Sequence, residues 1–226
     1  MTLAPATTLV IFDCDGVLVD SEVVAARVLA RELSAIGFPL TADDCLARYT
    51  GISMASVVER IQEEWGWPVP DGFLERVRAA DAEAFRAELR PVAGVREVVR
   101  ALAQPKCVAS SGRLAKMRLT LSLTGLLPFF APNLFSAEMV GRGKPAPDLF
   151  LFAAERMNSA PARCVVVEDS REGVRAAVAA GMRVLGFAGG SHCAPGHDAL
   201  LGAAGSSLVF TRMAELPRLL ESTALA

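Results

Sequence analysis

Residues 8–16 read Thr8-Leu9-Val10-Ile11-Phe12-Asp13-Cys14-Asp15-Gly16. The first five residues form a short β-branched and apolar run, which is typical of a buried parallel strand, and the polar sequence after it indicates a loop. Similar runs occur at 107–109, 164–167 and 183–187, with a shorter one at 134–135, and helical patterns at 94–103, 113–124, 147–157 and 170–180 alternate with them. The alternation predicts an α/β fold with a parallel sheet and right-handed crossovers.

The stretch from 21 to 90 has a different pattern, with no strand run and four helical patterns in succession. The first pattern stops at Gly37, and the second begins near Thr41, whose hydroxyl forms a candidate capping box with Asp44. Pro91 and Gly94 follow the fourth pattern and mark the return of the chain. We therefore expect an α/β core domain made of residues 1–20 and 91–226, interrupted by an all-helical domain at 21–90.

Composition narrows the classes of partner. The chain has 226 residues and a formal net charge of −2, and it contains no basic run, which argues against nucleic acid or an anionic membrane as a general partner. Its five cysteines are an odd number with no C-x-x-C pair, so we expect reduced core residues. The N-terminus lacks a basic signal-peptide region, and no apolar run approaches the ~18 residues of a membrane span. These features predict a cytoplasmic enzyme, and no feature indicates an obligate protein partner.

Polar side chains follow three of the expected strands. Ligands of parallel α/β sheets bind at the carboxyl ends of the strands, where this chain places Asp13, Asp15, Ser110, Ser111, Glu168 and Asp169. Carboxylates gathered at one edge repel each other unless a cation neutralises them. Oxygen ligands without histidine or cysteine favour Mg²⁺, with Asp13, Glu168 and Asp169 as candidate ligands.

The remaining candidates suit a phosphoryl group. Lys144 lies in a loop that contains Pro145 and Pro147, and its ammonium group could balance phosphoryl charge. Ser110 and the backbone N–H groups of Ser111 and Gly112 offer neutral donors to the same oxygens.

The two aspartates of the first loop then have complementary candidate roles. Asp13 is a plausible nucleophile that would form an aspartyl phosphate, and Asp15 a plausible general acid and base. Each feature alone is also typical of a turn, a helix cap or a solvated loop, but their joint occurrence at successive strand ends favours phosphoryl transfer.

These segments resemble the four motifs of the haloacid dehalogenase superfamily of aspartyl-phosphate phosphatases. The matching segments, in order, are Phe12-Asp13-Cys14-Asp15-Gly16-Val17-Leu18-Val19-Asp20-Ser21-Glu22, then Ser110, then Lys144-Pro145-Ala146-Pro147, then Glu168-Asp169-Ser170. The resemblance covers essentially the whole chain.

The resemblance implies a Rossmann-like core with an inserted all-helical cap that closes over the substrate. It implies that Asp13 is the nucleophile and an Mg²⁺ ligand, and that Asp15 is the acid and base, with its backbone carbonyl on the metal. Ser110 and Lys144 would hold the phosphoryl group, and Glu168 and Asp169 would complete the metal site. The implied activity is Mg²⁺-dependent hydrolysis of a small phosphorylated metabolite.

Within the superfamily, the Glu168-Asp169 pair is similar to β-phosphoglucomutase and its sugar-phosphate phosphatase relatives. The mutase pattern has a histidine where this chain has Ala25, and an arginine where Met54 follows Gly51-Ile52-Ser53. Both departures favour hydrolysis of a sugar phosphate, because a mutase must hold a second phosphate; the mutase stays an alternative, and an inactive binding or regulatory module is a second one. Asp15 argues against the dehalogenases, and the absence of lysine between 21 and 90 argues against the Schiff-base phosphonatases.

Three features leave alternatives open. His192 and His197 flank Cys193 in the stretch 189–197, which suits either a zinc site or, as we expect, a glycine-rich loop. In the helical domain, Arg48, Ser53 and Arg78 could meet the far end of a substrate or lie on solvated helix faces. Lysine supplies only three of the 23 basic residues. Lys144 in its proline-flanked loop is therefore a stronger indication of a functional role than a lysine in a lysine-rich chain would be.

Overall fold

The computed structural model describes residues 9–221, and in this part of the chain a six-stranded sheet forms the centre of the molecule. All its neighbouring strands pair in parallel, in the order β3-β2-β1-β4-β5-β6. The strands are β1 (Leu9–Phe12), β2 (Lys106–Ser110), β3 (Leu134–Ser136), β4 (Cys164–Glu168), β5 (Arg183–Phe187) and β6 (Leu208–Phe210). The α/β prediction is therefore confirmed; Thr8, which the sequence assigned to the first strand, lies outside the described residues.

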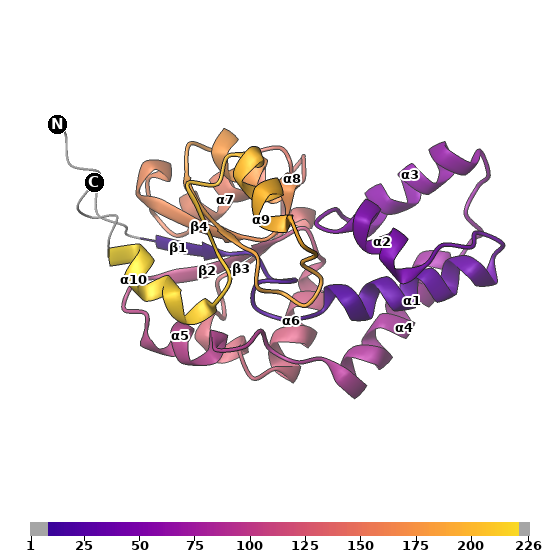
Figure 1. Ribbon diagram of the computed structural model, residues 1–226, viewed down its shortest axis with the longest axis horizontal. Helices are drawn as coiled ribbons and strands as arrows, with labels where there is room; N and C mark the ends of the chain where they lie inside the picture. Colours follow the sequence, from indigo (N-terminus) through magenta and orange to yellow (C-terminus); the bar gives the residue numbers. More distant parts are fainter. Residues whose placement is uncertain (1–8, 222–226) are drawn as a thin grey trace.

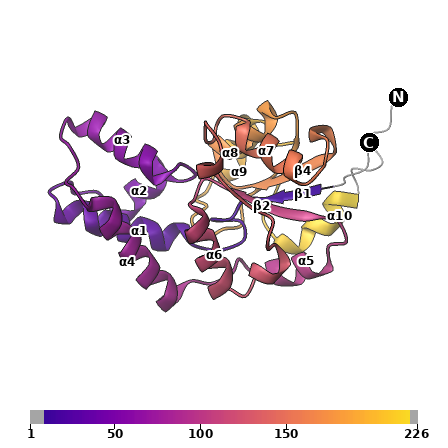
Figure 2. The same ribbon diagram turned by 180° about the vertical axis from the view of Figure 1, so that it is seen from behind.

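The sheet is covered by helices on both faces (Figures 1 and 2). One face carries α5 (Val95–Ala101), α6 (Leu114–Leu123) and α10 (Leu216–Glu221), and the other carries α7 (Asp148–Arg156), α8 (Arg171–Ala179) and α9 (His197–Ala204). Alternate residues of β1 supply the two cores, with Val10 and Phe12 in one and Leu9 and Ile11 in the other. Burial on both faces explains why the strand is a continuous apolar run.

A helical insert follows β1 and consists of α1 (Glu22–Ala35), α2 (Ala42–Tyr49), α3 (Met54–Trp65) and α4 (Phe73–Glu88). It has a buried cluster of its own, which includes Leu29, Leu33 and Ile61. At the start of α2, the Asp44 carboxylate accepts a hydrogen bond from the Thr41 backbone N–H at 2.9 Å, and the Asp44 N–H donates to the Thr41 hydroxyl at 3.1 Å. The capping box read from the sequence is therefore present.

The insert is joined to the rest of the molecule through two chain segments that run side by side. The Asp20 N–H donates to Arg90 O at 3.0 Å, and the Val92 N–H donates to Leu18 O at 3.0 Å. The predicted domain boundaries, 20/21 and 90/91, fall in this paired stem, and residues 1–8 and 222–226 of the predicted core lie outside the described part. The stem places the insert directly against the end of β1.

Some elements have no counterpart in the sequence prediction. They are β6, α9 and α10, all short, and Leu208 of β6 is 38% exposed.

Among the described residues, no helix has the length and apolarity that crossing a membrane requires. All five cysteines are free of disulfide bonds; four of them are buried, as expected, whereas Cys193 is only partly buried.

Comparison of a buried leucine in the insert with an exposed leucine elsewhere tests the assigned core of the insert. We expect Leu33→Ala to lower the free energy of unfolding by about 2–5 kcal/mol, because Leu33 is fully buried in the insert's own apolar cluster and its truncation leaves a cavity. Leu151→Ala removes the same atoms from an exposed position of α7 and should cost no more than about 0.5 kcal/mol. Urea denaturation measures both, and equal losses would contradict the assigned core.

Candidate active site

The carboxyl ends of the strands point at the helical insert, as the β1 arrow in Figure 1 shows. A cavity of about 640 Å³ lies between the two parts of the molecule. Core residues Asp13, Asp15, Ser110, Lys144 and Asp169 line it on one side, and residues of α1 to α4 line it on the other. This volume is in the range of small-molecule sites. The structure therefore brings residues expected at separate strand ends together around one cavity.

Lys144 lies between two carboxylates. Its Nζ is 2.5 Å from Asp13 Oδ1 and 2.6 Å from Glu168 Oε1, and the Lys144 side chain is 1% exposed. Burial raises the pKa of Asp13 well above its usual range; Lys144 opposes this shift, while Glu168 and Asp169 add to it. Lys144 is thus the buried counter-charge of the candidate nucleophile.

Asp15 has a cation of its own. Lys116, on the first turn of α6, places Nζ 2.9 Å from Asp15 Oδ1, and the Ser21 hydroxyl donates to the same oxygen at 2.5 Å. Burial opposes ionisation, but these two partners together lower the pKa of Asp15. Burial and the nearby Asp15 raise the pKa of Glu22 to about 7. Lys116 and Glu22 are further site residues, which no strand-end pattern in the sequence indicated.

Glu168 is held at the start of α8. Its Oε2 accepts hydrogen bonds from the Ser170 backbone N–H at 2.8 Å and the Ser170 hydroxyl at 3.0 Å, while Oε1 faces Lys144. Gly173 packs against this carboxylate so closely that a Cβ would overlap it. Glu168 therefore orients Lys144 in this structure, and its expected role as a metal ligand stays a prediction.

Asp169 contacts two histidines from beyond β5. His192 Nε2 lies 2.9 Å from Asp169 Oδ2, and His197 Nε2 donates to the Asp169 backbone oxygen at 2.6 Å. Burial opposes protonation of His192, but its contact with Asp169 raises the pKa of the imidazole to about 11. Both contacts were missed from the sequence, where these histidines belong to a loop with no assigned link to Asp169.

The segment from Ser110 to Gly112 forms a turn that touches the insert. The Gly112 N–H donates to the Ser110 hydroxyl at 3.0 Å, and the Ser111 hydroxyl donates to Gly51 O at 3.3 Å. Ser136, which the sequence did not single out, donates to Gly112 O at 2.8 Å. The expected phosphate-binding residues are therefore together and positioned by strands β2 and β3.

The three insert residues suggested for substrate contact have different positions. Ser53 lines the cavity and caps α3, with its hydroxyl accepting from Ser56 N–H at 3.1 Å. Arg78 also lines the cavity, 3.4 Å from Glu75. Arg48 is absent from the cavity wall as described and pairs with Glu64 at 3.1 Å on an exposed face. The structure thus places two of the three at the site.

The carboxylates at this edge of the sheet form a donor set suited to a divalent metal. Four carboxylates face this edge of the sheet, and the pKa of Asp13 is raised by burial, with Lys144 opposing and the other three acids adding to the rise. The nearby lysines, Lys116 and Lys144, offset only part of this negative charge. Hard cations such as Mg²⁺ prefer carboxylate and carbonyl oxygens. The residues present therefore fit a hard divalent cation held by Asp13, Asp169 and their neighbours.

Two glycines in helices distinguish the effect of steric overlap with Glu168 from the effect of alanine's higher helix propensity. We expect Gly173→Ala to lower the free energy of unfolding by about 1–3 kcal/mol, because the new methyl group displaces the buried Glu168 carboxylate. Gly202→Ala, in α9, meets no atom within 4 Å and should raise stability by up to about 1 kcal/mol. Urea unfolding of both variants checks this, and a stabilised Gly173→Ala protein would contradict the packing around Glu168.

Comparison with known proteins places this site in a family. Residues 7–181 match the family model of haloacid dehalogenase-like hydrolases. The 6-phosphogluconate phosphatase of Escherichia coli K12 is 32% identical over 211 residues, covering 93% of each protein. Hexitol phosphatase B of the same organism is 32% identical over 181 residues, covering 77% of this chain and 81% of that protein.

Solved structures agree with this placement. A conserved haloacid dehalogenase-like protein from Agrobacterium tumefaciens is 36% identical with a TM-score of 0.84, covering 97% of this chain and 100% of that one. A hydrolase of the same family from Deinococcus radiodurans, solved with phosphate and sodium bound, is 32% identical with a TM-score of 0.75 over 99% of both chains. The recognised motifs, the sheet order and these matches agree: the chain is an enzyme of the haloacid dehalogenase-like hydrolase family, from its sugar-phosphate branch, and a phosphoric monoester hydrolase.

Proposed function

We propose that this protein is an Mg²⁺-dependent phosphatase that hydrolyses a small phosphorylated sugar or polyol through an aspartyl-phosphate intermediate. One observation carries the proposal: two aspartates two residues apart face one cavity, and each has its own lysine, Lys144 for Asp13 and Lys116 for Asp15. A cytoplasmic location and a small metabolite as partner belong to the same proposal. The names of the E. coli relatives, which act on 6-phosphogluconate and hexitol phosphates, support this substrate class.

The first step transfers the phosphoryl group to Asp13. A carboxylate oxygen of Asp13 attacks phosphorus, the bond to the leaving oxygen breaks, and Asp15 in its protonated form gives its proton to the leaving alcohol. Lys144 and the N–H groups of the Ser110–Gly112 turn balance the charge on the phosphoryl oxygens. Mg²⁺, held by Asp13 and Asp169 with the Asp15 carbonyl and Glu168 as further candidates, supplies charge neutralisation when bound.

The second step returns Asp13 to its starting state. The Asp15 carboxylate left by the first step, which Lys116 and Ser21 stabilise, takes a proton from water. The water oxygen attacks phosphorus as the bond between Asp13 and phosphorus breaks, which releases inorganic phosphate and leaves Asp15 protonated for the next turnover. In this proposal residues 21–90 act as the cap, which keeps bulk water from the site during the first step.

The cavity also offers polar groups for a hydroxylated substrate. Asp81 on α4 lines the cavity and is buried, and its Oδ1 has no hydrogen-bond donor among the described residues. Burial raises the pKa of this carboxyl to about 6. A substrate hydroxyl would supply the missing partner, which favours a sugar or polyol over an apolar phosphoester.

Replacement of the nucleophile is the primary test. Asp13→Asn should lower Mg²⁺-dependent phosphate release from p-nitrophenyl phosphate by about 10³-fold or more, since the amide neither attacks phosphorus nor ligates the metal well. Asp71→Asn, on an exposed loop, is the matched control and should leave turnover unchanged. Circular dichroism checks the fold of both variants. Wild-type protein without activity above background, with or without Mg²⁺, would favour the inactive binding module instead.

A second measurement separates hydrolysis from the mutase alternative. Incubation with β-glucose 1-phosphate and glucose 1,6-bisphosphate should release inorganic phosphate without forming glucose 6-phosphate, because Ala25 and Met54 stand where the mutase pattern has a histidine and an arginine. Efficient formation of glucose 6-phosphate would establish the mutase. A parallel panel that includes 6-phosphogluconate and hexitol phosphates identifies the preferred substrate.

A further inference from the structure

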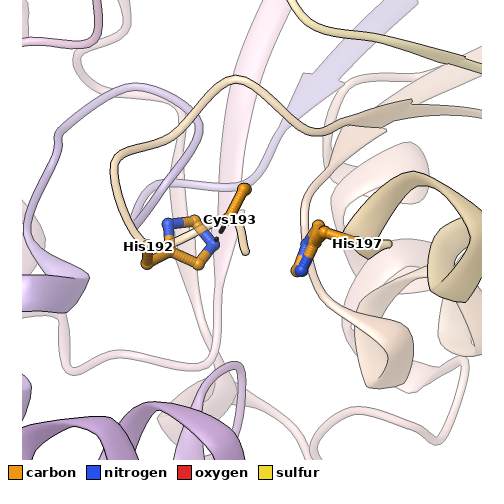
Figure 3. Close-up of side chains that lie close together, drawn as sticks. All are labelled: His192, Cys193 and His197. Atoms are coloured by element: carbon orange, nitrogen blue, oxygen red, sulfur yellow. Dashed lines mark hydrogen bonds between the residues drawn. The ribbon is translucent and has the colours of Figure 1, made fainter. Parts of the chain in front are cut away.

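The loop that follows β5 gathers three metal-binding side chains outside the carboxylate site. His192, Cys193 and His197 each offer one ligand atom, and these atoms all lie within 4.8 Å of one another. His192 Nε2 is 3.5 Å from Cys193 Sγ, and the two imidazole rings are 5.5 Å apart in an edge-on arrangement. Figure 3 shows the three side chains grouped together, with His192 and Cys193 joined by a dashed line. The sequence of 189–197 suits either a zinc site or, as expected, a glycine-rich loop; the loop is present, and the ligand atoms converge in it.

The spacing suits a tetrahedral metal. Zinc bonds of about 2.0–2.3 Å place two ligands of a tetrahedral site about 3.3–3.8 Å apart. The His192–Cys193 separation of 3.5 Å is already in this range. Cys193 and His197 are only partly buried, so their side chains have room to adjust around an ion.

The surroundings hold His192 in place before any ion binds. Its ring packs against two glycines: a Cβ on Gly16 or on Gly190 would lie 2.7 Å from ring carbon Cε1. The Ser191 backbone N–H and hydroxyl both donate to Asp20 Oδ1, at 3.0 and 2.8 Å, and so fasten the loop to the segment after β1. The site is therefore built on fixed backbone, which lowers the entropy cost of binding.

The ligand atoms of this cluster, nitrogen and sulfur, differ from the carboxylate oxygens of the neighbouring site. Burial opposes ionisation of the Cys193 thiol, but hydrogen bonds from His192 and His197 bring its pKa below the usual value, toward the thiolate that binds metals. Imidazole and thiolate select borderline-soft cations, whereas carboxylates select Mg²⁺. In addition, His192 Nδ1 is buried without a hydrogen-bond partner among the described residues.

We propose that His192, Cys193 and His197 form a binding site for a borderline-soft divalent cation of the zinc type. The His192 Nε2 atom that contacts Asp169 at 2.9 Å is also the one nearest, at 3.5 Å, to the cysteine sulfur. Occupation of this site therefore releases the proton that His192 Nε2 shares with Asp169 and exchanges this contact for a bond to the ion. The inference does not depend on the proposed phosphatase activity.

Cobalt provides a probe that distinguishes the two kinds of ligand. With excess Mg²⁺ present to fill the carboxylate site, titration with Co²⁺ should produce a thiolate-to-cobalt charge-transfer band in the near ultraviolet, saturating at one equivalent per chain, and Zn²⁺ should abolish the band. Cys193→Ser should lose the band and weaken Co²⁺ binding at least about tenfold. Cys164→Ser, which alters a buried thiol on β4, is the matched control and should retain both.

A second variant keeps the test independent of the cysteine. His197→Asn should weaken Co²⁺ binding while keeping the thiolate band at saturating metal, and circular dichroism checks that each variant is folded. Wild-type protein that gives no band, or a band of unchanged intensity and affinity in Cys193→Ser, would overturn the site. The three side chains would then serve only to hold Asp169 by hydrogen bonding.

Discussion

Electrostatic repulsion among acids at one edge of a parallel sheet is the constraint around which this molecule is arranged. Carboxylates from the ends of β1 and β4 meet there in surroundings with little water: Asp13, Asp15, Glu168 and Asp169. Each counter-charge comes from a different element: Lys144 precedes α7, Lys116 belongs to α6, and His192 follows β5. Elements on both faces of the sheet thus contribute charged groups to the same small region. Burying any one of these acids without its cation would cost several kcal/mol.

Space is the second limit on this edge. Gly16, Gly173 and Gly190 each approach a charged side chain so closely that a Cβ would collide with it. Gly16 also has φ of +76°, a conformation that other residues adopt only with strain. The acids can therefore lie against backbone on one side and a cation on the other, where burial makes charge interactions stronger than in bulk water.

The strands and the strand-end acids were predictable because each lies within a few residues of the apolar run that positions it. Lys116 was not predictable as a site residue, although lysine is scarce throughout the chain. It lies 101 residues from Asp15, and no local pattern indicates which way its side chain points. The same holds for the contact between His192 and Asp169. β6 and α9 each bury a single residue, and α10 is only six residues long, so none of them gives a periodic signal over the length that such a prediction needs. Long-range pairing of polar groups, rather than fold class, was the information missing from the sequence.

The contact of Gly51 with the core joins two parts of the molecule in one place. Gly51 packs against Ser170 without room for a side chain, and its carbonyl accepts from Ser111 in the turn expected to bind phosphate. A ligand that orders this turn therefore also strengthens the seating of the insert, and a seated insert orders the turn for the ligand, by the same free energy in both directions. Binding free energy from contacts between the insert and the distant end of a substrate thereby also stabilises the turn at its phosphoryl end.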